Sequence, residues 1–145
     1  MSSNESVLRW EQKWAEARLV RHVRADAAVA RSRVRLSERN LERARREHAG
    51  GDFDAALIFA EQALINAADA VLARDGFAVN SHVARFSYPA LPAIYAEERH
   101  LIDQIRSSRN RAQYEAGGDV DAGLAERATA VAVRALGSVQ ALIGT

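Results

Sequence analysis

Hydrophobic positions along this chain recur mainly with the period of an α-helix. The clearest stripe follows Asp52, where apolar residues return every three or four positions from Phe53 to Leu72. Asp52 is a good N-cap, because its carboxylate can accept the free amide hydrogens of a first helical turn. Gly76 is a good C-cap, because glycine readily adopts the left-handed conformation found there. The pattern predicts a helix over residues 53–75.

Further segments carry similar helical signals. They are residues 4–24 with Trp10 and Trp14 one turn apart, residues 27–48, residues 91–112, and a last helix that Asp119 or Asp121 can cap. We expect a break near Arg24–Ala27 and a connector over 76–89. No stretch alternates with period two for long enough to suggest a sheet. The fold class is therefore predicted to be all-α, and short connections make neighbouring helices antiparallel.

The predicted helices form one domain over residues 1–145, with an N-terminal helical extension over 1–35 and a bundle core over 36–145. The core positions are rich in alanine. At about 25 cal/mol per Å² of buried apolar surface, such small side chains each contribute little stability. We therefore expect a helical partner, most simply a second copy of the chain.

Composition narrows the class of protein. The chain has no cysteine, which excludes disulfides and thiolate metal sites and fits a reducing compartment. The start MSSNESVLRWEQKW lacks the apolar core of a signal peptide. No run approaches the roughly 18 consecutive apolar residues of a membrane span. We expect a cytoplasmic protein that needs no membrane and no cofactor.

Charge is distributed unevenly along the chain. Residues 1–49 hold 12 basic and 7 acidic side chains, whereas residues 50–145 hold 8 and 12. Most of the excess lies in the helix over 27–48 as Arg31, Arg33, Arg35, Arg39, Arg43, Arg45 and Arg46. A GC-rich genome explains why arginine replaces lysine, but not why the excess lies in one half. Arginine also marks phosphate recognition, because its planar fork matches phosphate oxygens.

Several kinds of catalytic site find little support. Only Glu97 and His100 have the spacing of a metal-ligand pair, and a di-iron bundle needs two such pairs and further carboxylates. We therefore predict no metal site. Ser81 and His82 are adjacent in sequence, which is not the geometry of a catalytic triad, and we expect His82 to be a capping or buried polar residue. Trp10 and Trp14 suit either helix packing or the stacking of nucleobases, with packing favoured.

The stretch IRSSRNRAQYEAGG, residues 105–118, is the main candidate for a site. Arg106 and Asn110 lie one turn apart at the end of a predicted helix, as do Ile105 and Arg109. An arginine beside an apolar stripe is partly desolvated and stabilises negative charge well. The alternative is that these arginines favour the helix C-terminus through its dipole.

Three stretches resemble the HEPN family, named for higher eukaryotes and prokaryotes nucleotide-binding. They are GDFDAALIFAEQALINAADAVLARDGF over 51–77, NSHVARF over 80–86 and RNRAQY over 109–114. The last is similar to the start of the family's Arg-x4-6-His signature. The resemblance runs from about residue 36 to the C-terminus. It implies an up-and-down four-helix bundle that forms a homodimer and, in the family, cleaves RNA without a metal at the dimer cleft.

The resemblance also implies roles for individual residues. Arg109 orients and neutralises the phosphate, with Arg106 and Arg111 as further phosphate ligands, and Asn110 fixes the helix end. The signature histidine is replaced by Tyr114. A tyrosine hydroxyl has an ordinary pKa near 10 and is a poor general base at neutral pH. The resemblance therefore implies nucleotide or RNA binding with weak or absent ribonuclease activity.

Three hypotheses stay open at this point. The first is the homodimeric nucleotide- or RNA-binding module, in a toxin–antitoxin or defence setting with a nucleotidyltransferase antitoxin. The second is an active metal-independent endoribonuclease toxin, with Tyr114, His82 or His100 carrying the proton. The third is a protein-interaction module that docks an acidic partner on the arginine-rich helix over 27–48.

Overall fold

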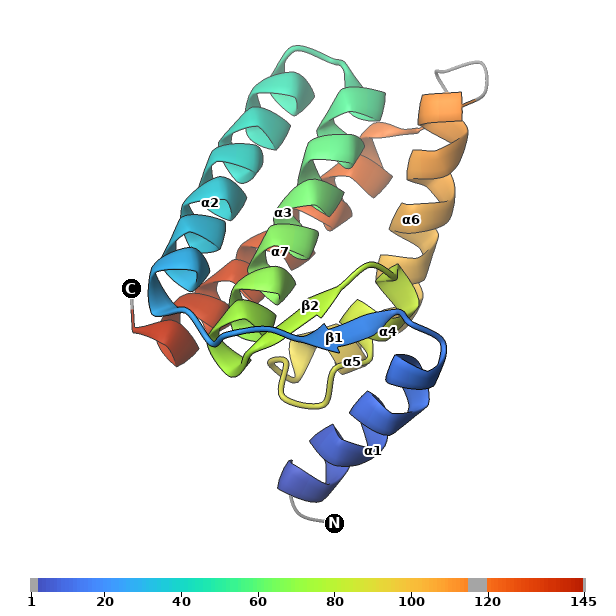
Figure 1. Ribbon diagram of the computed structural model, residues 1–145. Coiled ribbons are helices and arrows are strands. Elements are labelled where there is room, and N and C mark those ends of the chain that lie inside the picture. Colours follow the sequence, from blue (N-terminus) through green and yellow to red (C-terminus); the bar gives the residue numbers. More distant parts are fainter. Residues whose placement is uncertain (1–2, 115–119, 145) are drawn as a thin grey trace.

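A computed structural model describes residues 3–114 and 120–144 of the chain. Its elements are α1 (Ser3–Glu16), β1 (Val20–His22), α2 (Ala27–Ala49), α3 (Phe53–Asp75), β2 (Phe77–Val79), α4 (His82–Phe86), α5 (Ile94–Glu97), α6 (Arg99–Tyr114) and α7 (Ala122–Ile143) (Figure 1). The predicted helical class is confirmed, because the protein is mostly helical (78%). A small two-stranded sheet accompanies the helices.

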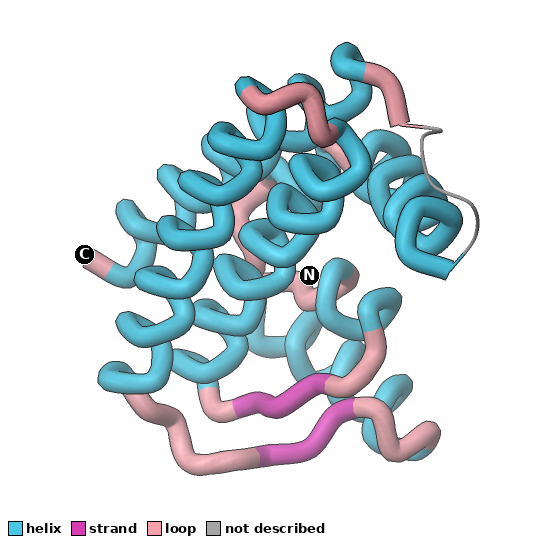
Figure 2. The backbone as a smooth tube through the Cα atoms, turned by 90° about the horizontal axis from the view of Figure 1, so that it is seen from above, coloured by secondary structure: helices cyan, strands magenta, loops and turns pink. Residues whose placement is uncertain are grey.

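Three long helices, α2, α3 and α7, pack together along their lengths (Figure 2). The predicted start and end of α3 are confirmed: Asp52 Oδ1 accepts from the Ala55 amide at 3.0 Å, and Gly76 has a φ of 88°. By length and composition α3 is also apolar enough to cross a membrane. However, 72% of its most apolar stretch is buried inside the protein, as is typical of a core helix.

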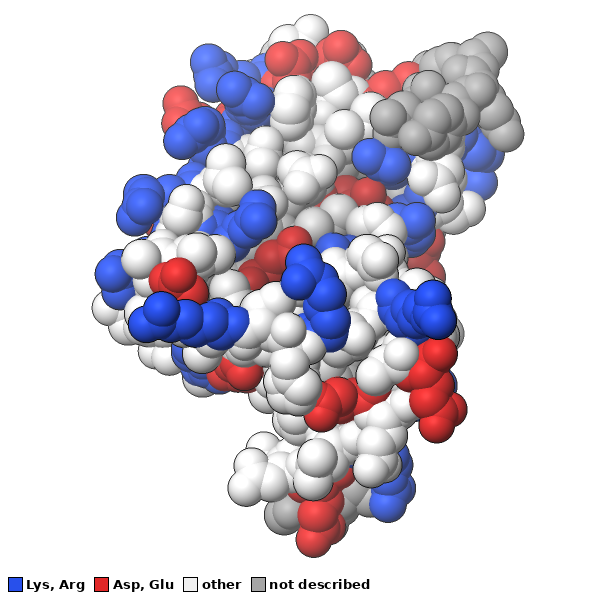
Figure 3. All heavy atoms as spheres, in the orientation of Figure 1, with Lys and Arg blue, Asp and Glu red and all other residues white. Residues whose placement is uncertain are grey.

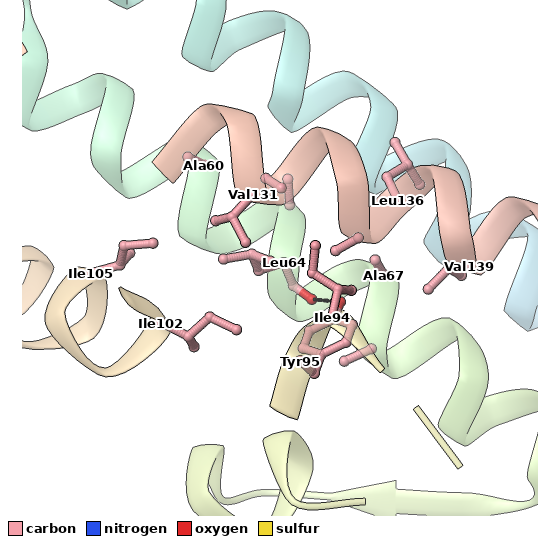
Figure 4. Close-up of a cluster of buried hydrophobic side chains, with 14 of the residues drawn as sticks. Ala60, Leu64, Ala67, Ile94, Tyr95, Ile102, Ile105, Val131, Leu136 and Val139 are labelled. Carbon is pink, nitrogen blue, oxygen red and sulfur yellow. Dashed lines mark hydrogen bonds between the residues drawn. The ribbon is translucent and has the colours of Figure 1, made fainter. Parts of the chain in front are cut away.

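The core is built around α3 and is rich in alanine. Leu64 of α3 points toward Val131 of α7, and Ile102 and Ile105 of α6 approach from another side (Figure 4). Tyr95 of α5 closes the cluster, and its hydroxyl donates to the Leu64 carbonyl at 2.8 Å. Fully buried alanines on the facing helices let the helix axes approach closely. They are Ala30, Ala44, Ala56, Ala60, Ala63, Ala67, Ala68, Ala70, Ala125, Ala128 and Ala135.

The two-stranded sheet corrects two predictions. β1 pairs antiparallel with β2, from Val20 opposite Val79 to His22 opposite Phe77 (Figure 2). The helix predicted over 4–24 is wrong beyond Glu16, and the connector predicted over 76–89 holds β2 and α4. Strands of three residues are too short to produce a recognisable alternation of polar and apolar positions.

The turn after α1 gave no glycine signal. Arg18 takes the left-handed position with a φ of 59°, and the Leu19 amide donates to the Trp14 carbonyl at 3.0 Å. This is the hydrogen-bond pattern of a Schellman C-cap, in which glycine is the usual residue. The helix therefore ends well before the break that we predicted near Arg24–Ala27.

Helix boundaries differ elsewhere as well. The helix predicted over 91–112 is split by Glu98 into α5 and α6. Asp121 caps α7 by accepting from the Leu124 amide at 2.7 Å, which confirms one of the two predicted caps. Asp119 lies outside the described residues. The predicted boundary between residues 35 and 36 falls inside α2.

Candidate functional site

Charged side chains from α3, α4 and α6 gather at one corner of the bundle. We call these residues the charged corner: Glu61, Asp69, His82, Arg85, Arg106 and Arg109. α3 supplies the two acids, α4 supplies His82 and Arg85, and α6 supplies the other two arginines. The corner therefore brings together residues from all three quoted stretches: the two acids come from 51–77, His82 and Arg85 from 80–86, and Arg109 from 109–114.

The ion pair between Arg109 and Glu61 lies deepest. Arg109 Nε is 3.4 Å from Glu61 Oε1, and the two side chains are only 22% and 2% exposed. Burial raises the pKa of the Glu61 carboxyl, whereas the positive charges of Arg109, Arg106 and Arg85 act to lower it. Arg109 Nε and Glu61 Oε2 have no hydrogen-bond partner within the described ranges. The pair is thus an electrostatic contact in which Arg109 Nε could still donate a hydrogen bond and Glu61 Oε2 could still accept one.

Arg106 lies one turn before Asn110 and borders a small cavity between α4 and α6. The cavity has a volume of about 50 Å³. Given the volume that one buried water molecule needs, the cavity has space for a few waters. Its walls are His82, Val83, Phe86, Ser87, Tyr95, Arg99, Ile102, Asp103 and Arg106. Arg106 Nη1 is buried and, within the part of the chain that the structure describes, has no hydrogen-bond partner. Buried donors without an acceptor are unusual, and here the same side chain also lines the cavity.

His82 is held neutral at the wall of the same cavity. Its Nδ1 lies 3.2 Å from Arg85 Nη1, and a guanidinium can only donate, so Nδ1 accepts and Nε2 carries the proton. Burial, with the positive charges of Arg106, Arg85 and Arg109, lowers the pKa of His82 to about 4. At neutral pH the imidazole therefore offers one N–H donor and no charge.

Arg85 anchors this arrangement. Its Nε donates to Asp69 Oδ1 at 2.7 Å, and its Nη2 donates to the Val79 carbonyl at 3.1 Å. Ser81 caps the short helix α4 by accepting from the Ala84 amide at 3.3 Å. The capping role therefore belongs to Ser81, whereas His82 faces the arginines of α6. Sequence reasoning did not find Glu61 or Arg85, because both lie among ordinary helical positions.

The other predicted site residues lie elsewhere or are not described. Asn110 is partly buried on α6. Arg111 is exposed and folds back along its own helix, donating to the hydroxyls of Ser107 and Ser108 at 3.2 and 3.1 Å. Tyr114 is the last residue of α6, and its side chain lies outside what the structure describes. The structure thus brings together Arg106 and Arg109, but not Arg111.

Two further groups of residues have clear positions. Trp10 is 5% exposed and packs in the core, as the favoured interpretation predicted. The arginines of α2 are exposed, and Figure 3 shows basic side chains gathered along that side of the molecule. Arg43 lies over the Phe59 ring at 5.6 Å from its centroid, and Arg46 is 4.0 Å from Glu42. Across the described ranges, no three potential ligands meet to form a metal site.

Comparison of the chain with family models, with curated proteins and with solved structures finds no match. The resemblance to the HEPN family therefore depends on the three quoted stretches of sequence alone and stays a prediction.

Proposed function

We propose that this protein is a homodimeric HEPN-type helical module that binds a nucleotide or RNA through a phosphate at the charged corner, with weak or no ribonuclease activity. The observation that carries the proposal is the position of Arg106. Its Nη1 is buried and has no hydrogen-bond partner among the described residues, and the Arg106 side chain lines a cavity together with His82. In the proposal, Arg109 of the RNRAQY stretch supports the same site from one turn further along α6.

The chemistry of the cavity favours an anion. The charged groups on its walls are Arg99, Arg106 and Asp103, which leaves a net positive charge while His82 is neutral. A phosphate oxygen would accept from the Arg106 guanidinium and from the Nε2–H of His82. Charge-assisted hydrogen bonds of this kind are about twice as strong as neutral ones. A volume of about 50 Å³ suits a phosphoryl group better than a base.

Arg106→Ala is the sharpest test of this site. The variant removes unpaired donors, whereas Arg109→Ala would also strip the buried Glu61 of its nearest positive charge. We expect binding of a single-stranded RNA octamer, measured by fluorescence anisotropy in EDTA, to weaken about tenfold or more, because a charged hydrogen bond contributes about 1.5–3 kcal/mol. Arg134→Ala, at an exposed position on α7, is the matched control. Equal binding by wild type and Arg106→Ala would reject the assignment.

The pH dependence of binding gives a second readout. Burial, together with the positive charges of the three arginines, holds the pKa of His82 near 4. A bound phosphodiester offsets those positive charges, so the pKa of His82 rises in the complex. RNA should therefore bind more tightly as the pH falls from 7 toward 5, with proton uptake. His82→Gln should remove most of this dependence. An octamer without terminal phosphates is the right probe, because its phosphodiesters do not titrate in this range.

A second candidate function is metal-independent cleavage of RNA, and the placement of His82 favours it. His82 and Arg106 line one cavity, whereas His100 is exposed and does not line it. A neutral imidazole can accept the proton of a 2′-hydroxyl at Nδ1 once that nitrogen is released from Arg85 Nη1, and a neighbouring arginine can stabilise the charge on the phosphate. RNA incubated in EDTA would then be cleaved by wild type but not by His82→Gln or Arg106→Ala. Intact RNA with tight binding supports the first function instead.

The proposal extends to partners. A HEPN-type module of this kind acts in the cytoplasm as a twofold dimer, in a toxin–antitoxin or defence setting with a nucleotidyltransferase antitoxin. Light scattering of the purified protein tests the dimer, and co-expression with a neighbouring nucleotidyltransferase tests the partner. An alternative is docking of an acidic protein on α2. Charge reversal of Arg39, Arg43 and Arg46 would then abolish partner binding, whereas Arg106→Ala would leave it unchanged.

A further inference from the structure

Helix α1 is fixed to the bundle by one deeply buried tryptophan. Trp10 Nε1 donates to the Ala84 carbonyl of α4 at 2.8 Å. Its ring packs edge-on against Phe77 at 5.2 Å and tilted against Tyr88 at 4.6 Å between centroids. Buried aromatic contacts with a satisfied N–H hold a helix in one position. Trp10 therefore anchors α1 against α4 at one edge of the molecule (Figure 1).

Trp14 lies one turn further along the same face of α1 and has a different environment. It is only partly buried and borders an open cavity of about 270 Å³. Lys13 Nζ lies 4.7 Å from the centroid of the Trp14 ring. The cavity is lined by Ser6, Arg9, Trp10, Lys13, Trp14 and Ser87, so none of the described residues that line it is acidic. A partly exposed indole in a cavity that two cationic side chains also line is the composition of a stacking site for a nucleobase.

Ser87 connects this cavity with the one at the charged corner. It lies on the wall of both, at the end of α4. Its Oγ donates at 3.1 Å to the Ala84 carbonyl, the same oxygen that accepts from Trp10. The two cavities are therefore neighbours separated by one well-fixed serine. The cavity at the charged corner has a volume of about 50 Å³ and the one beside Trp14, which is more open, about 270 Å³, so the second has more room for a base.

We propose that a single-stranded nucleic acid follows this path, with a phosphate at Arg106, the backbone passing Ser87, and a base stacked on Trp14 between Arg9 and Lys13. The inference rests on the proposed function and adds the substrate class: a strand of several nucleotides rather than a mononucleotide. In the complex Lys13 leaves the indole face and pairs with a phosphate. Base pairing would keep the stacked base inside a duplex, so the path selects single strands.

Binding of AMP, the dinucleotide UpU, an RNA octamer, the DNA octamer of the same sequence and an RNA duplex tests the path. For Trp14→Ala we expect about tenfold weaker binding of the RNA octamer, the usual effect of losing one stacking ring, with AMP binding unchanged. Trp14→Phe should retain most of the affinity. Leu8→Ala, at an exposed position on the same helix, is the control. In wild type the octamer should quench tryptophan fluorescence, and Trp14→Phe should lose that quenching.

The possible results separate the two proposals. If the wild type binds neither AMP nor RNA, the proposed function fails. If AMP binding depends on Arg106 but Trp14→Ala binds the octamer as wild type does, the nucleic-acid path alone is wrong. Equal affinity for the duplex would also overturn the path. The path would also be wrong if Trp14→Ala lost dimerisation but kept RNA binding, because a second copy of the chain would then be what covers the cavity. A DNA octamer that binds as well as RNA supports the path and indicates that it does not read the 2′-hydroxyl.

Discussion

The α2–α3–α7 core and the charged corner share helix α3 but differ in the kind of side chain that they bury. In the core, alanines and branched aliphatic side chains such as Leu64, Val131 and Val139 fill the space between helices and have almost no surface exposed to solvent. At the corner, Glu61 is as buried as those side chains, yet Glu61 Oε2, Arg106 Nη1 and Arg109 Nε lack hydrogen-bond partners among the described residues.

The difference shows which part of the molecule stability alone explains. Burial of apolar surface accounts for the residues of the core. Burying an ion pair commonly brings no net stability over well-packed apolar residues of the same volume. Charged groups with perturbed pKa values beside a cavity are instead typical of functional sites. The comparison therefore directs functional tests to the corner and stability tests to the core.

The largest loss of stability is expected from a cavity in the core. Leu64→Ala should lower the free energy of unfolding by about 3 kcal/mol, through lost burial and the space left behind. Leu64 is 1% exposed and lies where α3 packs against α5 and α7. Urea denaturation gives the value. Leu142→Ala, at a position that is 44% exposed, should change it by less than about 0.5 kcal/mol.

A smaller loss is expected at the corner, and it should be reversible by a second substitution. Arg109→Leu leaves Glu61 buried without its nearest positive charge and should lower the free energy of unfolding by about 2 kcal/mol, less than for a fully buried pair. Adding Glu61→Leu should restore most of it. A double variant as unstable as the sum of the two single variants would show that the corner contributes to stability as the core does.

The pH dependence of stability should separate the two regions further. The folded state holds the pKa of His82 near 4 instead of the ordinary 6.5, so the unfolded state binds more protons between these values. The contribution of His82 to stability is therefore complete above pH 6.5 and is lost as the pH falls toward 4. Glu61, whose pKa is raised, contributes with the opposite sign, because its contribution is lost as the pH rises.

His82→Gln isolates the histidine, because Glu61 is present in both proteins. The difference in the free energy of unfolding between wild type and His82→Gln should favour wild type more at pH 7 than at pH 4.5. Thermal unfolding at several pH values measures it. A constant difference across this range would mean that the folded state does not disfavour the charged imidazole. Core variants such as Leu64→Ala should show a constant difference.

The smallest effect is expected at the turn after α1, and it is a gain. Arg18 takes a left-handed φ of 59°, which costs a residue with a side chain roughly 1 kcal/mol relative to glycine. Arg18→Gly should therefore raise the free energy of unfolding. The gain should be only about 0.5 kcal/mol, because glycine also has greater conformational freedom in the unfolded chain. Arg21→Gly, in strand β1, should instead destabilise the protein.

The long helices were predictable because their signals are local. The Asp52 cap, the Gly76 cap and the apolar stripe between them lie within one segment, so α3 could be drawn almost to the residue. Arg106 and Arg109 could be recognised for the same reason, since their spacing on one helix follows from the sequence alone. The sequence by itself thus determined the helical class, most of the long helices and the helix that carries the candidate site.

Only the tertiary structure decided which residues lie next to Arg106 and Arg109. Glu61 and His82 come from other helices, and the strand pair joins segments on either side of α2 and α3. Contacts of this kind depend on how far each helix turns before it packs, which no local pattern records. The same physics explains the two tryptophans: Trp10 and Trp14 look equivalent one turn apart, and only the packing of α1 on α4 buries the first and leaves the second at the edge of a cavity.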